Sequence, residues 1–179
     1  ALTLAESSRK HHIRQNHGLL YGEKYSVFDV MRLCGWPAEQ VPQNVGGYKL
    51  DTETGSLPIF IKYEASQYGD RFLNPGEIEW FSKNNRSLKS NEFRWLLDGT
   101  ERTPEWQNRH FVPIFIRRKA EEQEKSYYFV GSAVALDDVR TSVNPGEDGS
   151  ESKVVISTLK LDKPVDPELY RHLTGKSAL

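Results

Sequence analysis

The chain has 179 residues with a formal net charge of −1, of which 37% are hydrophobic and 27% charged, as expected for one globular domain and not for a disordered chain. Its 8 Tyr, 8 Phe and 4 Trp residues supply large apolar side chains to a core. No apolar run approaches the roughly 20 residues that span a bilayer, so we expect no membrane partner. The single cysteine, Cys34, cannot form an intramolecular disulfide, which favours a reducing cytoplasm.

The first elements are a connector and a short helix. We interpret residues 1–20, which are largely polar, as a connector or helix from an upstream region, and 21–179 as the main domain. The predicted helix begins after Ser26, a typical N-cap, and ends at Gly35, just before Pro37. Its apolar face consists of Val27, Val30, Met31 and Cys34.

The middle of the chain has the alternating pattern and the β-branched and aromatic residues of strands. We predict a hairpin of strands 46–50 and 57–64 around a turn at 51–56, and further strands at 78–80, 92–97, 111–117, 127–133 and 154–161. A mobile loop is expected at 144–152. A closing helix at 164–173 is predicted with Asp166 as its cap and Pro167 at its first position. These elements predict an α+β fold, a curved, partly closed antiparallel β-barrel with flanking short helices.

The sequence lacks the spacings that metal sites and common catalytic motifs require. His11, His12 and His17 lie far from any cysteine pair, so we expect no metal ligands and no cofactor. Cys34 lies on the apolar face of the predicted helix, which favours a structural role. No nucleophile elbow or phosphate-binding loop occurs, and only nearness to aromatic residues suggests Asp70 or Glu64 as a general base. We therefore predict that the chain is not an enzyme.

The segment from Tyr68 to Ser90 interleaves aromatic residues with Asp, Asn, Ser, Arg and Lys. Aromatic faces stack on bases, Asp and Asn hydrogen-bond base edges, and Arg and Lys bind phosphates. This composition is typical of a nucleic-acid interface. It is equally compatible with Trp80 as a core residue whose polar neighbours only decorate loops.

The same segment carries a resemblance to a known family. Its most specific motif is Tyr68-x-Asp70-x-Phe72-x-Asn74-Pro75, followed by Trp80-x-Ser82-x-x-x-Arg86-x-Leu88-x-Ser90. Further matching residues run from Tyr25 to Thr174, in Tyr25–Trp36, Gly47–Lys49, Pro58–Tyr63, Phe115, Tyr128–Gly131 and Leu159–Val165. In these motifs the chain resembles the family of the domain of unknown function 3427, found behind superfamily II helicase cores in bacterial defence proteins.

The resemblance implies a target-recognition module of modification-dependent (Type IV) restriction enzymes, which carry a helicase motor and a phospholipase-D-like nuclease on the same chain. The expected ligand is double-stranded DNA containing 5-methylcytosine or 5-hydroxymethylcytosine, and the expected partners are the helicase and nuclease domains. A PUA/SRA-like barrel fits this role. The alternative is a non-catalytic protein-interaction or regulatory domain of a helicase, marked by an exposed apolar patch.

A methyl group on cytosine is most easily tested when the base is flipped into a pocket. Such a pocket needs two aromatic walls, an acceptor for the N4 amino group and donors for O2 or N3. We expect Asp70 to be the acceptor, with Asn74, Ser82 or Asn84 as donors. The candidate walls are Tyr48, Tyr63, Tyr68, Phe72 and Trp80, and the candidate phosphate contacts are Arg71, Lys83, Arg86 and Lys89.

Overall fold

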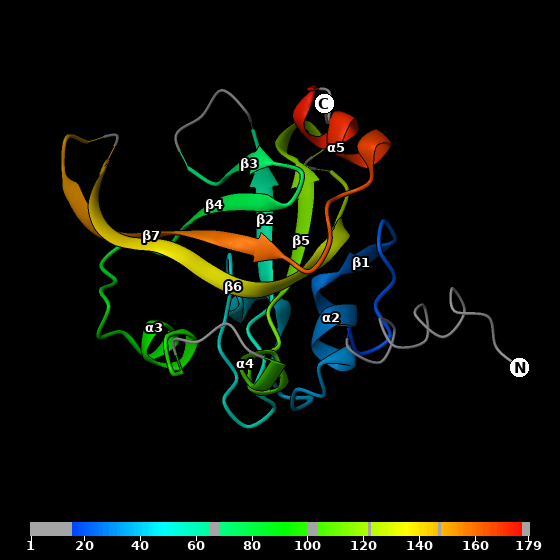
Figure 1. The fold of residues 1–179 in the computed structure, drawn as a ribbon, viewed down its shortest axis with the longest axis horizontal. Helices are drawn as coiled ribbons and strands as arrows, with labels where there is room; N and C mark the ends of the chain where they lie inside the picture. The colour runs from blue at the N-terminus through cyan, green and yellow to red at the C-terminus, as the bar shows by residue number, and fades with distance from the viewer. Residues whose placement is uncertain (1–15, 65–68, 100–103, 122, 147, 177–179) are drawn as a thin grey trace, which may run out of the picture.

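The computed structural model describes residues 16–64, 69–99, 104–121, 123–146 and 148–176 (Figure 1). Its described part contains one seven-stranded sheet and a few short helices. The strands are β1 (Lys24–Ser26), β2 (Ile59–Tyr63), β3 (Arg71–Asn74), β4 (Glu77–Phe81), β5 (Pro113–Arg118), β6 (Ser126–Pro145) and β7 (Glu151–Leu161). The helices are α2 (Val27–Leu33), α3 (Asn91–Leu96), α4 (Pro104–Arg109) and α5 (Pro167–Thr174), with 3-10 turns η1 (Pro42–Asn44) and η2 (Lys119–Glu121).

The sheet curls into a half-barrel, which confirms the predicted curved, partly closed α+β fold (Figure 1). Its strand order is β2-β5-β6-β7-β4-β3, with β1 paired to β6. The hydroxyl of Tyr63 on edge strand β2 accepts a hydrogen bond from the backbone N–H of Phe72 on edge strand β3, at 3.4 Å. The two edge strands of the sheet therefore meet, and they are joined by this hydrogen bond to a side chain instead of by backbone pairing.

The predicted all-antiparallel pairing is wrong for one pair of strands. Strands β2 and β5 run parallel, from Ile59 opposite Ile114 to Tyr63 opposite Arg118. Between them the chain forms β3, β4, α3 and α4, a connection long enough to return to the starting end of β2. The sheet is therefore mixed.

Strands β6 and β7 form a long hairpin that projects from the body of the domain (Figure 1). Strand β6 has 20 residues and pairs first with β1 and β5, then with β7 as far as Pro145 opposite Glu151. The loop predicted at 144–152 is therefore shorter, because both strands extend into it. We call the outer part of this hairpin, from Arg140 to Val155, the β-arm.

The core consists of two clusters on opposite sides of the sheet. The larger contains Trp80 and Phe93, and the smaller lies under α2 and contains Met31 and Cys34. Burial raises the pKa of the Cys34 thiol to about 12. The thiol is therefore protonated at neutral pH, in agreement with a structural role.

Both predicted terminal helices are present, and their caps explain where they begin. Ser26 accepts a hydrogen bond from the backbone N–H of Asp29, whose carboxylate accepts one from Ser26 in return. Asp166 accepts from the backbone N–H groups of Glu168 and Leu169 at the start of α5. These capping residues are local signals, so the sequence alone is enough to place the helices.

The strand predicted at 92–97 is wrong, because this segment forms helix α3. Phe93 and Leu96 are both buried, and a spacing of three residues brings them to one face of a helix. Helix α4, at 104–109, was not predicted.

Part of the expected N-terminal connector packs on the domain. Leu19 is buried in the smaller core cluster, and the Asn16 amide donates to the hydroxyl of Tyr21. Residues 1–15 of the predicted connector lie outside the described residues. Among the described helices none is long and apolar enough to cross a membrane.

Candidate functional site

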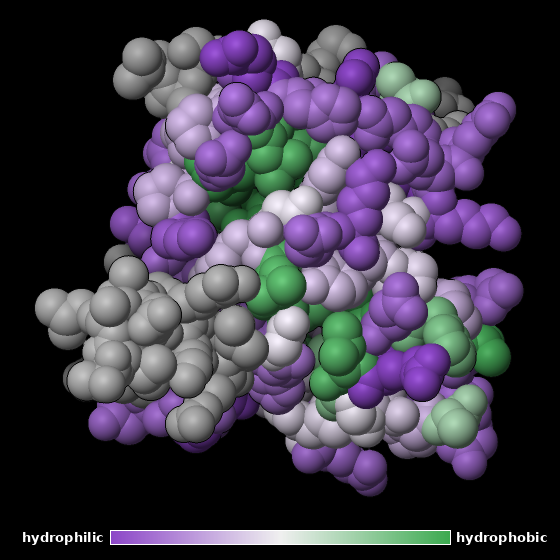
Figure 2. All heavy atoms as spheres, turned by 90° about the vertical axis from the view of Figure 1, so that its right-hand side faces the viewer, coloured by the Kyte–Doolittle hydropathy of each residue, from purple (hydrophilic) through white to green (hydrophobic). Residues whose placement is uncertain are grey.

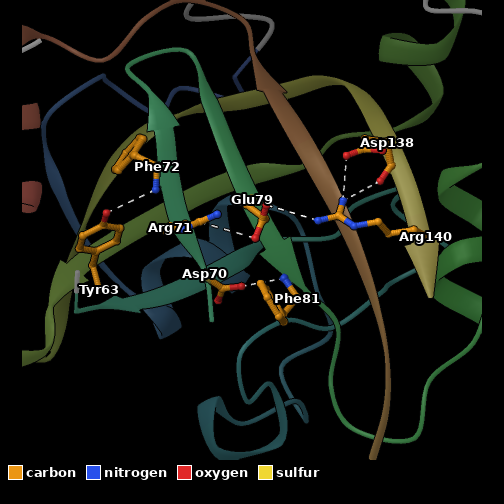
Figure 3. Close-up of polar contacts among 8 residues, drawn as sticks. All are labelled: Tyr63, Asp70, Arg71, Phe72, Glu79, Phe81, Asp138 and Arg140. Atoms are coloured by element: carbon orange, nitrogen blue, oxygen red, sulfur yellow. Dashed lines mark hydrogen bonds and ion pairs between the residues drawn. The ribbon is translucent and has the colours of Figure 1, made fainter. Parts of the chain in front are cut away.

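Strand β4 has one buried and one open face, and the open face carries the candidate site. Ile78 and Trp80 point into the larger core cluster, whereas Glu77, Glu79 and Phe81 alternate with them and are half-buried. The site therefore lies on the side of the sheet away from that cluster, around the end of β4 (Figure 3).

Asp70, in the segment before β3, is fixed against β4 by one hydrogen bond. Its Oδ1 accepts from the backbone N–H of Phe81 at 2.7 Å (Figure 3). Burial raises the pKa of Asp70 to about 6, and the bond from Phe81 offsets part of this effect. Within the part of the chain that the structure describes, no residue other than Phe81 donates a hydrogen bond to this carboxylate. At neutral pH it is therefore an ionised acceptor with capacity for another donor.

A line of alternating charges crosses the same face (Figure 3). Glu79 lies 3.6 Å from the Arg71 guanidinium and 3.4 Å from that of Arg140. Arg140 also donates to the backbone carbonyl and the carboxylate of Asp138, both at 3.0 Å. The register of β6 shifts between Asp137 and Arg140, and Asp138 has a φ of +51°. This irregularity brings Arg140 to the face that holds Asp70.

Four of the five predicted aromatic walls lie in the core instead of on this face. Tyr48, Tyr63, Phe72 and Trp80 are each at most 7% exposed. Their rings pack on one another, with centroids 5.1 Å apart for Tyr48 and Trp80 and 5.7 Å apart for Tyr63 and Phe72. Rings packed in this way stabilise the fold and present no open face to a base. The fifth, Tyr68, lies outside the described residues.

Two of the predicted polar residues of the base pocket, Ser82 and Asn74, form hydrogen bonds within the protein. Ser82 is buried, accepts from the N–H of Val155 at 2.8 Å and donates to the carbonyl of Lys83 at 2.9 Å. Asn74 is exposed and accepts from the N–H of Gly76 in the turn between β3 and β4. Among the described residues, neither side chain forms a hydrogen bond with the Asp70 carboxylate.

Asn84 is exposed and connects its loop to the β-arm. Its Oδ1 accepts from the Asn144 amide at 3.2 Å. This bond places the loop that carries the predicted phosphate contacts beside the β-arm.

The predicted phosphate contacts differ in how freely they can bind an anion. Lys89 is exposed, and no described residue forms an ion pair with it. Arg86 lies 3.7 Å from the buried carboxylate of Glu92. Lys83 donates to the carbonyl of Val45 at 3.2 Å, and burial followed by the nearby Arg86 lowers its pKa. Arg71, described above, is exposed beside Glu79.

Sequence reasoning missed Glu79, Phe81, Asp138 and Arg140. The alternation around Trp80 was a usable signal for the first two, because neighbours of a core residue on a strand point away from the core. No local signal marks Arg140, since its position depends on the irregularity in β6. The described residues contain no cluster of three or more His, Cys, Asp or Glu suited to a metal ion.

Comparison with solved structures finds SUVH5 SRA complexes and other structures, all at low identity. The SUVH5 SRA in complex with hemimethylated CG DNA is 13% identical, with a TM-score of 0.47 over 83% of this chain and 93% of that chain. The SUVH5 SRA bound to fully hydroxymethylated CG DNA is 12% identical, with a TM-score of 0.45 over 83% and 93%. Arabidopsis thaliana SUVH6 in complex with SAM is 10% identical, with a TM-score of 0.40 over 93% and 33%.

Comparison with curated proteins finds no match. The model of the family described as a domain of unknown function (DUF3427) matches residues 19–173, and the chain therefore belongs to this family.

Proposed function

We propose that this chain is a DNA-binding module that reads modified cytosine, 5-methyl or 5-hydroxymethyl, in duplex DNA and catalyses no reaction itself. Asp70 is the observation that carries the proposal. Its carboxylate is half-buried, fixed by Phe81 and ionised at neutral pH, with capacity for another donor. The N4 amino group of cytosine is such a donor.

A carboxylate at this depth is better suited to a flipped base than to a base in the stack. Partial burial strengthens the bond to the amino group and makes an unpaired amino group costly. Phe81, whose backbone N–H binds Asp70, also supplies a half-buried aromatic ring on β4. Such a ring can stack on an extruded base. In this proposal Phe81 takes the role that the sequence assigned to the buried rings, and Tyr68 stays a predicted second wall.

Phosphate contacts are assigned to the cations around this face. Lys89 and Arg86 lie on the exposed loop beside the β-arm, and Arg71 and Arg140 flank Glu79. With a net charge of −1, the chain depends on this local group of cations for its attraction to DNA. Binding is therefore expected to weaken steeply as salt rises.

The resemblance supplies the wider context of the proposal. A module that binds modified DNA without cleaving it can direct the helicase and nuclease domains of a parent restriction protein to their target. The module itself needs only binding residues for this task.

The test compares three duplexes that are identical except for one cytosine, which is unmodified, 5-methylated or 5-hydroxymethylated. Fluorescence anisotropy with the full chain gives the dissociation constant for each. Asp70→Asn keeps an oxygen for the N–H of Phe81 but replaces the other oxygen with an NH2 donor. The N4 amino group is common to all three cytosines, so the variant should weaken the flipped-base mode of binding by about 1–3 kcal/mol, or about five- to 150-fold, and leave the three duplexes with similar affinities.

The matched control is Asp98→Asn, which makes the same substitution at an exposed carboxylate beside Arg109. It should bind all three duplexes as the wild type does. A wild-type chain without preference among the duplexes would contradict the proposal, as would an Asp70→Asn variant with an unchanged preference.

A further inference from the structure

A second surface, separate from the Asp70 face, is a cavity of about 670 Å³ between the segment before β1, strand β6 and the start of α5. It lies where β6 changes partners. Phe129 exchanges backbone hydrogen bonds with Gly22 and Glu23, whereas Ser132 accepts from the N–H of Asp162. The change of partner leaves a notch beside β6. Figure 2, which views the side where β1 and α5 lie, shows a hollow with a hydrophobic floor and a hydrophilic rim.

The floor and one wall of the cavity are apolar or aromatic. Phe129, Val130 and Val165 are buried, and Leu169 and Tyr21 are half-buried. The hydroxyl of Tyr21 donates to the Asp162 carboxylate, so the wall is fixed before any ligand arrives. Concave apolar surfaces of this size and rigidity accept bulky side chains or small molecules.

The rim is acidic. Glu23, Asp166 and Glu168 line it, all are exposed, and none forms an ion pair with another described residue. Lys163, the one cation among the described lining residues, lies over the Tyr21 ring at 3.8 Å from its centroid. Three carboxylates against one ammonium favour a cationic ligand and disfavour phosphate groups.

We propose that this cavity docks a segment of a partner protein that inserts one bulky aliphatic side chain between flanking Lys or Arg residues. The apolar floor accepts the aliphatic side chain, and the carboxylates of Glu23 and Glu168 lie in position for the flanking cations. The cavity shares no lining residue with the Asp70 face, so a bound partner and bound DNA use different residues. A docking surface of this kind also matches the alternative interpretation of the sequence as a protein-interaction domain.

The test is a titration of the ¹⁵N-labelled full chain with acetyl-Lys-Leu-Lys-amide, followed by amide chemical shifts. We expect saturable shifts at Gly22, Val130 and Leu169. Acetyl-Glu-Leu-Glu-amide tests the charge, and acetyl-Lys-Ser-Lys-amide tests the apolar side chain. The proposal is overturned if the basic leucine peptide gives no saturable shifts at these amides, or if either control peptide binds there equally well.

Charge-reversal variants test the rim directly. Glu23→Lys with Glu168→Lys should weaken binding of the basic peptide about fivefold, since each exposed charge contact contributes about 0.2–1 kcal/mol. Glu39→Lys with Glu53→Lys makes the same change in net charge at exposed positions outside the cavity lining. Equal weakening by both pairs of substitutions would show a general charge effect and would overturn the proposed site.

Discussion

The backbone N–H of Phe81 donates a hydrogen bond to Asp70 at 2.7 Å, and this bond joins the segment before β3 to the end of β4. The carboxylate that receives it has a pKa raised to about 6, because burial disfavours the charged form more than the single bond stabilises it. An ionised Asp70 therefore costs the fold free energy. A group that is costly for stability and accurately positioned is typical of a binding or catalytic site.

The first prediction is that Asp70→Asn stabilises the protein at neutral pH. The folded pKa of about 6 lies above the ordinary aspartate value of 3.8, so the folded state binds the proton more tightly than the unfolded state. Stability contributed by this group falls as pH rises from about 3.8 to about 6, and the penalty is fully present above that range. The variant should gain about 2–3 kcal/mol at neutral pH and nothing near pH 4. Urea unfolding at both pH values measures this, and a loss of stability at neutral pH would show a structural role for the carboxylate.

The second prediction concerns pH and recognition. Protonation of Asp70 turns its open oxygen from a charged acceptor into a hydroxyl, which is a much weaker acceptor for the cytosine N4 amino group. The preference for modified cytosine should therefore decrease as pH falls through about 6. Anisotropy titrations at a series of pH values check this, with Asp70→Asn as the reference. A preference with the same pH dependence in the variant would assign the effect to another group.

The third prediction separates two adjacent aromatic residues that face opposite sides of β4. Trp80 is 1% exposed, so Trp80→Ala should destabilise the fold by about 3–5 kcal/mol. Phe81 is half-buried, and Phe81→Ala should cost about 1–2 kcal/mol while lowering the affinity for modified DNA. Unfolding and binding are measured on both variants. If folded Phe81→Ala binds modified DNA as the wild type does, Phe81 is not a wall of the base pocket.

The contrast between Trp80 and Phe81 also shows what the sequence could predict. Alternation along β3 and β4 brings Phe72, with its partner Ile78, and Trp80 to one side of the strand pair. It does not say which side faces the core, because aromatic residues suit both a core and a base pocket. In the structure this side faces the core, whereas Asp70 lies before β3 and accepts a hydrogen bond from the backbone N–H of Phe81.

Elements with local signals were predictable, and those determined by distant contacts were not. The caps at Ser26 and Asp166 mark α2 and α5. The parallel pairing of β2 with β5 joins residues 55 positions apart, such as Ile59 and Ile114, and the position of Arg140 depends on a bulge. Six-residue α3 is too short for its period to be distinguished from that of a strand.

The fourth prediction is that Arg86→Ala has two separable effects. Arg86 lies 3.7 Å from Glu92, whose Oε1 is buried and has no hydrogen-bond partner among the described residues. Removing the guanidinium takes away the ion pair and leaves the carboxylate with the nearby Tyr48 hydroxyl, which should cost about 1–3 kcal/mol of stability. It should also lower the affinity for all three duplexes equally, because a phosphate contact carries no sequence information.

The double variant Arg86→Ala with Glu92→Gln separates these effects. Neutralising the buried carboxylate should restore most of the stability, while the affinity for DNA stays low. Recovery of affinity together with stability would mean that Arg86 supports the fold and does not contact phosphate.

The last prediction concerns a buried histidine that ties α3 to α4. The ring of His110 is stacked on Trp106 and tilted against Trp95, with centroids 4.5 Å away in both cases. Its Nδ1 lies 2.7 Å from the carbonyl oxygen of Trp106, and its Nε2 lies 2.7 Å from that of Trp95. His110→Phe keeps an aromatic ring but removes both nitrogens, so at least one buried carbonyl loses its donor. We expect a loss of about 1–3 kcal/mol in the free energy of unfolding.

His172→Phe is the matched control, because that ring is on the surface of α5 beside Glu121 and should change stability by about 0.5 kcal/mol or less. Because neither histidine lies on the Asp70 face, both folded variants should keep the preference for modified cytosine. An unchanged stability for His110→Phe would show that the two carbonyls are satisfied without the histidine.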